Sequence, residues 1–273
     1  MTEPLQHTPL YQTHLALGGK IVPFAGWEMP IQYKEGILAE ARAVRTASGL
    51  FDVSHMGRIW LTGPQSAALL GWITTAELPK LALGQGRYTL ICTQAGGIID
   101  DAIVYRLGEQ AHLLVCNGSN RPAVWEWLCR WQQAKFPDLQ MQDRTTEVGM
   151  IAFQGPASVA AMERLSPGLP KKLRYFRIAQ AAVAGIPALV ARTGYTGEDG
   201  FEVMPSSADT PALWQRLQET GAAPCGLGAR DVLRTEMGYC LYGHELTPEH
   251  TPLEAGLLWS VSMAKEPGFV GRE

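Results

Sequence analysis

Apolar and polar residues alternate along this chain with two different periods. A spacing of three and four residues predicts amphipathic helices, and strict alternation predicts strands. The helical spacing occurs at residues 36–47, at 123–135 and from 210 onward. Residues 5–35 mix short apolar runs with Gly and Pro, which indicates loops leading into the first helix. The strand pattern occurs at residues 58–62, 86–93, 98–107, 112–116, 149–154, 178–184, 187–191 and 200–204.

One strand-helix pattern occurs twice. The strand at 58–62 is followed by Gly63-Pro64 and a predicted helix, and the strand at 149–154 is followed by Gly155-Pro156 and another. Proline suits the first turn of a helix. The two copies lie too far apart for a solenoid repeat, but their separation fits two lobes. We therefore predict an α+β fold with two pseudo-duplicated lobes and largely antiparallel sheets, the 86–93 and 98–107 strands forming a hairpin around Gly96-Gly97.

The length of 273 residues favours two lobes over a single core. We expect a discontinuous first lobe at 1–54 plus 141–260 and a second lobe at 55–140. Residues 261–273 end in Phe-Val-Gly-Arg-Glu, without a turn or a charged tail. We interpret them as the start of a truncated C-terminal segment.

Composition narrows the class of protein. Hydrophobic residues make up 46% and charged residues 18%, which is typical of a folded protein. A formal net charge of -3 argues against nucleic-acid binding. The five cysteines include no C-x-x-C pair, so neither a disulfide framework nor a metal site is expected. Because no leader sequence and no long apolar run occur, we expect a cytoplasmic protein that does not enter a membrane.

Two adjacent aspartates follow the Gly96-Gly97 turn. Strand alternation places Asp101 on the same face as Ile103 and Tyr105, and Asp100 on the opposite face. Both faces of the strand are mostly apolar. Burying a carboxylate on such a face costs free energy unless the group is paired with a partner or serves a function. Tyr105 would suit the wall of a pocket for a flat heterocycle. Alternatively, either aspartate accepts backbone amides of the hairpin.

The segment 192–202 packs three glycines around Tyr195 together with three carboxylates. Such a composition lets backbone approach a ligand closely, although an ordinary surface turn is the alternative. It lacks the Gly-Lys-Ser/Thr end of a Walker loop. Glu202, on the strand that leaves the loop, could accept two hydrogen bonds from an amino-pyrimidinone edge.

The sequence G-L-G-A-R-D at 226–231 only partly matches a dinucleotide-binding fingerprint. Its third glycine is missing and residues 222–225 form a poor strand, so we reject that function. Arg230 begins the helix predicted at 231–238 and could bind a ligand carbonyl or carboxylate. The alternative is an ion pair with Asp231 or Glu236.

A histidine stands beside a serine in F-D-V-S-H-M-G at 51–57. No G-x-S-x-G nucleophile elbow supports hydrolase chemistry there. We interpret His55 as structural and Met56 as a soft apolar contact.

Six motifs together resemble one family, the glycine cleavage T proteins, or aminomethyltransferases. Each motif is weak alone, but they occur in family order over nearly the whole chain. They are F-A-G-W-E-M-P at 24–30, F-D-V-S-H-M-G at 51–57, G-G-I-I-D-D at 96–101, F-Q-G-P at 153–156, R-T-G-Y-T-G-E-D-G-F-E at 192–202 and G-L-G-A-R-D at 226–231.

The resemblance implies tetrahydrofolate as cofactor and the lipoylated H protein as partner. The methylene of the aminomethyl-lipoyl group would pass to tetrahydrofolate with release of ammonia. Separately from the resemblance, we expect a monomer. Asp101 matches the catalytic aspartate, acting through electrostatics and hydrogen bonding rather than as a nucleophile. The positions that match the family's folate site are Met56, Tyr88, Ile103, Tyr105, Asn117, Tyr195, Glu202 and Arg230.

The sequence leaves three alternative functions open. The family normally continues into a further, mostly β domain, so a truncated, non-catalytic folate-binding module is one alternative. The folate-binding half of dimethylglycine or sarcosine dehydrogenases is another, although those enzymes carry a flavin domain. A folate-dependent relative of iron-sulfur assembly would show K-G-C-Y-x-G-Q-E, whereas residues 237–245 read M-G-Y-C-L-Y-G-H-E, with no lysine and a displaced cysteine.

Overall fold

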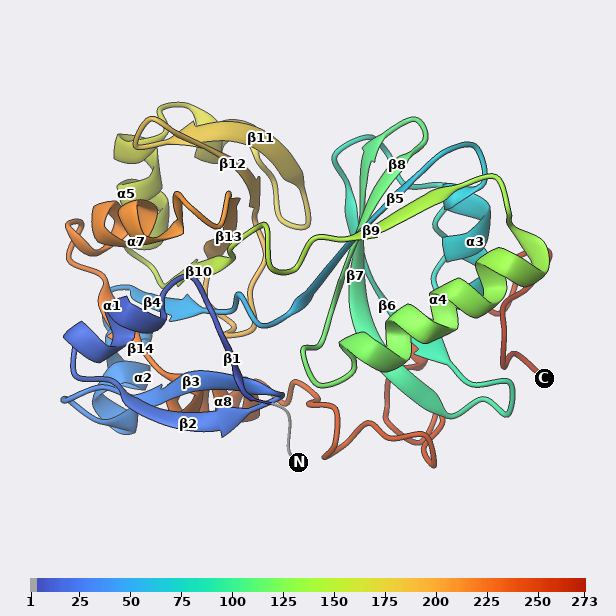
Figure 1. Cartoon of the computed structure of the whole chain (residues 1–273), viewed down its shortest axis with the longest axis horizontal. Coiled ribbons are helices and arrows are strands. Elements are labelled where there is room, and N and C mark those ends of the chain that lie inside the picture. The colour runs from blue at the N-terminus through green and yellow to red at the C-terminus, as the bar shows by residue number, and fades with distance from the viewer. Residues whose placement is uncertain (1–3) are drawn as a thin grey trace. The chain divides into compact units, whose positions relative to one another are not determined.

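The computed structural model describes residues 4–273, which divide into two compact units. Unit 1 comprises Met1–His55 and Thr145–Tyr239, and unit 2 comprises Met56–Arg144 and Cys240–Glu273. Each unit combines helices with mostly antiparallel strand pairs (Figure 1). The predicted α+β fold class is confirmed.

The division differs from the predicted lobes in four places. His55, predicted to be in the second lobe, belongs to unit 1, and residues 261–273, predicted to be a separate C-terminal segment, belong to unit 2. Residues 141–144 belong to unit 2, because strand β9 (Gln140–Asp143) pairs with strand β5 (Gly57–Thr62). Residues 240–260, predicted to be in the first lobe, also belong to unit 2. There Leu246 and Leu257 join a buried apolar cluster with Ile98, and the Ile98 backbone N–H donates to the Thr247 carbonyl. Burial of these side chains, which no local pattern encodes, assigns the segment to unit 2.

Unit 1 contains two sheets. Its strands are β1 (Gln6–His7), β2 (Lys20–Phe24), β3 (Trp27–Gln32), β4 (Gly49–Asp52), β10 (Ile151–Gln154), β11 (Ile178–Val183), β12 (Ile186–Ala191), β13 (Gly200–Pro205) and β14 (Ala223–Cys225). The larger sheet has the order β11-β12-β13-β10-β4-β14, and the smaller has the order β1-β3-β2. Neighbouring strands are antiparallel except in the β1–β3 and β14–β4 pairs.

Helices complete the core of unit 1. They are α1 (Tyr11–Ala16), α2 (Ile37–Thr46), α5 (Ser158–Leu165), α6 (Leu169–Lys172), α7 (Thr210–Gln218) and α8 (Leu227–Glu236). Trp214 of α7 is fully buried against Phe153 and Phe201 of the larger sheet, in one apolar cluster. Burying aromatic side chains of this size contributes much of a core's stability.

Two expectations for unit 1 were wrong. Residues 5–35 are not loops, because β2 and β3 form a hairpin around Ala25 and Gly26, both with positive φ. Prolines in both strands obscured the pattern. Pro23 is tolerated because β2 is an edge strand, and Pro30 because it lies beyond the two residues of β3 that pair with β1. Residues 222–225 are not a poor strand either, since β14 pairs with β4 at the edge of the larger sheet, where Pro224 is also tolerated.

Unit 2 is built on one five-stranded antiparallel sheet. Its strands are β5, β9, β6 (Gly86–Cys92), β7 (Ile98–Gly108) and β8 (Ala111–Cys116), in the order β6-β7-β8-β5-β9. Helices α3 (Ser66–Ile73) and α4 (Arg121–Lys135) cover one face of it (Figure 1), and a 3-10 helix, η1 (Leu258–Ser260), contacts β6. Within residues 4–273, no helix is long and apolar enough to cross a membrane.

The predicted hairpin and the repeated strand-helix pattern are both confirmed. Strands β6 and β7 pair antiparallel across the Gly96-Gly97 turn. Gly63 follows β5 with φ 114°, and Gly155 follows β10 with φ 123°. After each glycine, the first helical residue, Ser66 or Ser158, donates its backbone N–H to the glycine carbonyl at 3.1 and 2.9 Å. The same turn therefore starts α3 in unit 2 and α5 in unit 1.

Candidate functional site

Strand pairing in unit 2 brings Tyr88 close to Asp101. Tyr88 of β6 lies opposite Ile103 of β7, and Leu90 lies opposite Asp101, so Tyr88 and Asp101 are diagonal neighbours. The Tyr88 hydroxyl donates to Asp101 Oδ2 at 3.0 Å. Asp101 is partly exposed, whereas Asp100 is fully buried. The two carboxylates, which alternation places on opposite faces of β7, therefore also differ in exposure.

Asn117, directly after β8, contacts both aspartates. Its side-chain Nδ2 donates to Asp101 Oδ1 at 2.7 Å and to Asp100 Oδ1 at 2.8 Å. Its backbone N–H donates to Asp100 Oδ2 at 2.9 Å, and Asn120 Nδ2 donates to Asp100 Oδ1 at 2.6 Å. Burial and the charge of Asp101 hold the pKa of Asp100 well above its usual range, against the opposing effect of the asparagine hydrogen bonds. Asp100 thus accepts a backbone amide, although not one of the hairpin.

The exposed aromatic surface near Asp101 differs from the one expected. Tyr105, predicted to line a pocket, is completely buried. The Tyr88 ring instead stacks on Trp259 of η1, with centroids 5.3 Å apart and planes at 21°. Trp259 is 71% exposed. The sequence did not point to Trp259, because it lies far along the chain and reaches Tyr88 only through the packing of residues 240–273 on unit 2.

The loop at 192–202 in unit 1 is held at both ends and in the middle. Arg192 binds Asp199 through two hydrogen bonds of 2.9 and 2.6 Å. The buried Gln154 side chain donates to the Thr193 carbonyl at 3.0 Å and accepts from the Thr196 hydroxyl at 3.0 Å. A Cβ at Gly194 would overlap the Gln154 side-chain oxygen. Side-chain hydrogen bonds and close packing on Gln154 therefore fix the conformation of this loop, unlike that of an ordinary surface turn.

Residues of this loop form one side of a second cluster of predicted site residues. Glu202 of β13 is 5% exposed and accepts the Thr193 hydroxyl at 2.5 Å. Burial raises the pKa of Glu202, while the Thr193 hydrogen bond and the charge of Arg230 oppose that rise. The Arg230 guanidinium lies over the Tyr195 ring, 4.7 Å from its centroid, and Tyr195 stacks on Tyr239 at 5.8 Å.

Arg230 lies near the start of a helix, as predicted, but the helix begins earlier than expected. The predicted helix at 231–238 in fact begins at Leu227, so Arg230 occupies its first turn. Asp231 pairs with Arg234 at 2.8 Å, and Glu236 pairs with Arg45 at 2.7 Å. Both acids that the sequence offered to Arg230 thus have other partners.

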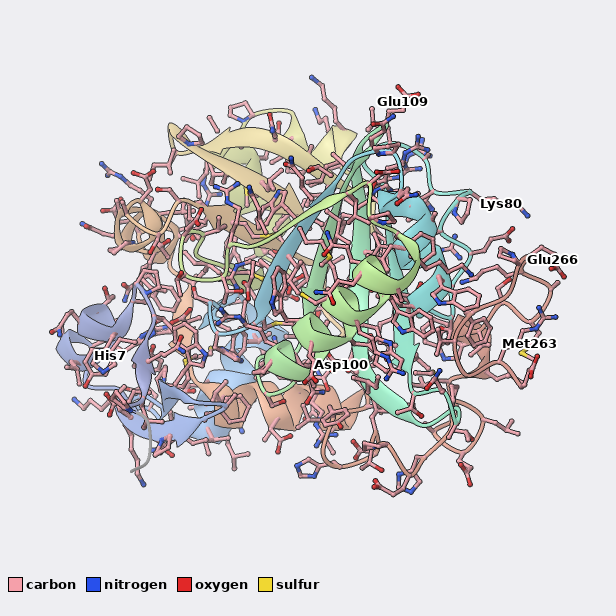
Figure 2. The ribbon with its side chains drawn as sticks, turned by 45° about the vertical axis from the view of Figure 1, so that its right-hand side comes forward. His7, Lys80, Asp100, Glu109, Met263 and Glu266 are labelled. Carbon is pink, nitrogen blue, oxygen red and sulfur yellow. The ribbon has the colours of Figure 1, made fainter. Side chains whose placement is uncertain are left out.

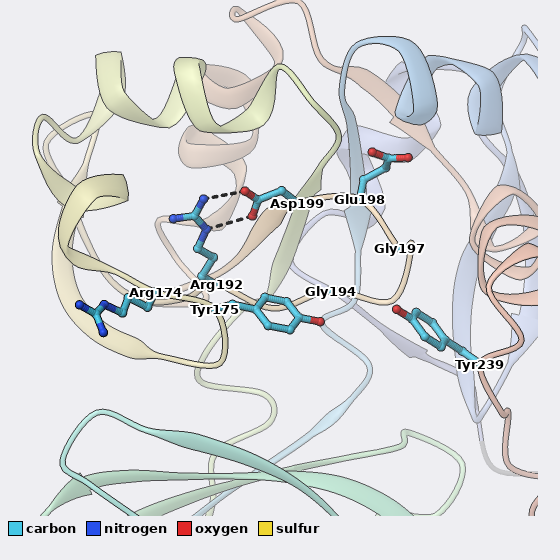
Figure 3. Close-up of a pocket in the computed structure, with 8 residues that line it drawn as sticks. All are labelled: Arg174, Tyr175, Arg192, Gly194, Gly197, Glu198, Asp199 and Tyr239. Atoms are coloured by element: carbon cyan, nitrogen blue, oxygen red, sulfur yellow. Dashed lines mark hydrogen bonds and ion pairs between the residues drawn. The ribbon is translucent and has the colours of Figure 1, made fainter. Parts of the chain in front are cut away.

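A pocket of about 510 Å³ opens beside this cluster, lined wholly by unit 1 (Figure 3). The side chains of Tyr175 and Tyr239 point toward one another across it. Sequence reasoning selected neither tyrosine; the only signal was the position of Tyr239 in M-G-Y-C. The lining residues are Arg174, Tyr175, Arg192, Gly194, Gly197, Glu198, Asp199 and Tyr239.

The predicted site residues therefore fall into two groups, each within one unit. Unit 2 brings Tyr88, Ile103 and Asn117 to Asp101, and Unit 1 brings Tyr195, Glu202 and Arg230 together. Tyr105 is on β7 but buried. Met56 is the first residue of unit 2, and its carbonyl accepts Arg58 Nη1 at 2.5 Å.

Comparison with known proteins identifies a family. The model of the GCVT N-terminal domain matches residues 10–265. The chain is 45% identical over 281 residues to the aminomethyltransferase of Symbiobacterium thermophilum, covering 100% of this chain and 75% of that one. It is 48% identical over 268 residues to the aminomethyltransferase of Rubrobacter xylanophilus, covering 98% and 71%.

Solved structures agree with this match. The crystal structure of glycine cleavage system aminomethyltransferase T from Bartonella henselae superposes with a TM-score of 0.90 at 34% identity, covering 98% of this chain and 73% of that one. A chain of the heterotetrameric sarcosine oxidase of a Corynebacterium species, at 19% identity and a TM-score of 0.52, shares the fold alone. Taken together, the matched family domain and the similarity over the whole chain show that this protein belongs to the GCVT aminomethyltransferase family.

Proposed function

We propose that this chain is a tetrahydrofolate-dependent aminomethyltransferase of the glycine cleavage system. It would transfer the methylene of the aminomethyl-lipoyl group on the H protein to tetrahydrofolate and release ammonia. The observation that carries the proposal is the partly exposed Asp101 carboxylate, held by the Tyr88 hydroxyl and the Asn117 amide, in a member of this family.

The reaction needs a fixed negative charge. The carbon-sulfur and carbon-nitrogen bonds of the aminomethyl group break, and the carbon becomes bonded to two nitrogens of tetrahydrofolate. The thiol and ammonia carry away the two protons that those nitrogens lose. Positive charge develops at the carbon while its bonds change, and a preorganised carboxylate stabilises that charge without reorganising. Asp101 has this role, because two hydrogen bonds orient its oxygens before the substrate binds.

The second cluster fits the heterocycle of tetrahydrofolate. An amino-pyrimidinone edge presents adjacent N–H donors, and a carboxylate can accept two of them. Glu202 is a buried acceptor of this kind, kept in place by Thr193. Tyr195 contacts the Arg230 guanidinium and stacks on Tyr239, so the cluster presents flat aromatic groups of the kind that suit a heterocyclic ligand. We assign recognition of the pterin to these residues and the chemistry to Asp101.

The direct test is to mix the chain with tetrahydrofolate and aminomethylated H protein and to measure ammonia. We expect release by the wild type and a loss of roughly 10²–10³-fold in turnover for Asp101→Asn, because one charge-stabilising group is removed. Tetrahydrofolate binding, measured by calorimetry, should stay within a few-fold of wild type.

The matched control is Asp138→Asn, the same chemical change at an exposed position of unit 2. Its turnover should equal that of the wild type. Near-normal ammonia release by Asp101→Asn would contradict the role of Asp101. Tetrahydrofolate binding without any ammonia release by the wild type would instead favour the non-catalytic folate-binding module.

A further inference from the structure

Asp100 is a buried carboxylate that the proposed reaction does not use. Its exposure is 0%, and it lies near the start of α4 (Figure 2). Placing a carboxylate in a protein interior is costly unless hydrogen bonds compensate it. The burial of a second carboxylate directly beside Asp101 therefore needs a structural explanation.

The hydrogen bonds of Asp100 converge on Asn117. Oδ2 accepts the Asn117 backbone N–H at 2.9 Å, and Oδ1 accepts the Asn117 side-chain amide at 2.8 Å. Asn117 is thus held at its backbone and its side chain by the same carboxylate. Asn120, the residue before α4, donates to Oδ1 at 2.6 Å and to the Ile99 carbonyl at 3.1 Å, so Oδ1 accepts two side-chain amides.

The same amide nitrogen of Asn117 reaches Asp101. Nδ2 lies 2.7 Å from Asp101 Oδ1 and 3.2 Å from the Asp101 carbonyl oxygen. Asn117 therefore bridges the two carboxylates. An asparagine after a strand can otherwise occupy several rotamers. Because Asp100 binds both the backbone and the side chain of Asn117, the Asn117 amide is restricted to one rotamer, and so is the Asp101 carboxylate that it binds.

We propose that Asp100 is a positioning residue, which fixes Asn117 so that its amide holds the Asp101 carboxylate in one orientation. The effect on turnover rests on the proposed function of Asp101. Orientation of a catalytic group is worth much of the rate, and a misplacement of about 1 Å can cost on the order of 10²-fold. Asp100 would act without touching the substrate.

A double-mutant cycle tests this coupling. In Asp100→Asn, an amide replaces one acceptor oxygen, so a donor would meet the donors of Asn117. We expect kcat to fall about 10–100-fold with KM for tetrahydrofolate within about twofold, since only the reacting geometry changes. Asn117→Ala should show a similar loss. The double variant should be no worse than Asn117→Ala alone, whereas multiplicative losses would overturn the proposal.

Asn120→Ala is the matched control. Like Asn117→Ala it removes an amide donor to Asp100 Oδ1, but Asn120 donates to Asp100 and the Ile99 carbonyl rather than to the Asp101 carboxylate. Its kcat should stay within about threefold of wild type. If Asp100→Asn does not fold, the comparison of Asn117→Ala with Asn120→Ala still tests the proposal. Equal kcat values in these two variants would refute it.

A readout independent of activity separates this proposal from the proposed function. Three-bond couplings measured by NMR report the χ1 rotamer of Asp101. We expect one dominant rotamer in the wild type and in Asn120→Ala, and averaging in Asn117→Ala and in Asp100→Asn. A single unchanged Asp101 rotamer in folded Asp100→Asn would overturn the proposal. A wild type that releases no ammonia would refute the proposed function, while these couplings would still decide the role of Asp100.

Discussion

At the scale of single residues, neighbouring aspartates have different environments. Asp100 is buried among amide donors, whereas Asp101 is partly exposed and receives a tyrosine hydroxyl and one amide. Strand alternation is sufficient to separate the two carboxylates, because side chains of a strand point to opposite faces. It does not identify Asn117 as their common partner, since that contact depends on the pairing of β7 with β8.

Glu202 offers a test of ligand recognition at this scale. Glu202→Gln keeps the shape but replaces one acceptor oxygen by a donor, which would face the donor edge of the pterin. We expect Kd for tetrahydrofolate to rise about 10–100-fold, the equivalent of about 1–3 kcal/mol for an unsatisfied buried group. Isothermal titration calorimetry measures this change.

The control for that substitution is Glu219→Gln, at an exposed position just after α7 in the same unit. Its Kd should match that of the wild type. An unchanged Kd in Glu202→Gln would remove Glu202 from the binding site.

At the scale of elements, the β6–β7 hairpin places Tyr88 and Asp101. Its turn is predictable from Gln-Ala-Gly-Gly, because only glycine readily adopts the positive φ of 90° found at Gly96. The reason for the second glycine is tertiary. A Cβ at Gly97 would overlap the carbonyl oxygen of Pro248, in the segment that returns to unit 2.

Gly97→Ala should therefore destabilise unit 2. Forcing a methyl group against backbone typically costs about 1–3 kcal/mol. Urea unfolding followed by circular dichroism gives the change in unfolding free energy. Gly71→Ala in α3 is the control, because a Cβ there meets no atom within 4 Å. That variant should be more stable by about 0.5–1 kcal/mol, since alanine favours a helix. Equal stability of the two variants would contradict the close packing of Pro248 on the turn.

Elements with a clear period were predictable, and those defined by partners were not. Helix α4 and strands β5 to β8 follow from spacing and alternation, with bounds within a few residues. Strand β14 did not, because a three-residue strand containing Pro224 has no period and exists only through its pairing with β4. The helix that contains Arg230 begins four residues before its predicted start, and a partner distant in the chain again explains the difference. The backbone N–H of Gly226, just before this helix, donates to the Glu40 carboxylate of α2 at 2.8 Å.

At the scale of the molecule, a buried network links the N-terminal segments of unit 1. Asp52 Oδ2 accepts the Thr8 hydroxyl at 2.6 Å and lies 2.9 Å from His14 Nε2, whose Nδ1 lies 2.7 Å from the Tyr33 hydroxyl. Burial by itself would raise the pKa of Asp52. Its interactions with His14, Thr8 and Ser54 outweigh burial and lower the pKa to about 2.

This lowered pKa predicts acid sensitivity. Because the folded-state pKa lies below the value in the unfolded chain, the contribution to stability is present above about pH 4 and is lost as the pH falls toward about 2. The contribution is about 2 kcal/mol. Urea unfolding between pH 2 and pH 7 should show this decline in the wild type, on the order of the stated energy. Asp52→Asn should lack that part of the pH dependence, and an identical slope in both proteins would contradict the assignment.

Local pattern alone was enough for the α+β class, for most helices and strands, for the aspartate pair and for the motifs of the aminomethyltransferase family. These features depend on residues close together in the chain, where spacing and turn chemistry act directly. Folding in three dimensions decided the rest: that residues 240–273 pack with unit 2, that Trp259 meets Tyr88, and that Asn117 joins Asp100 to Asp101. The physical reason is that burial and hydrogen bonding act between groups brought together by packing, which a period along the chain does not record.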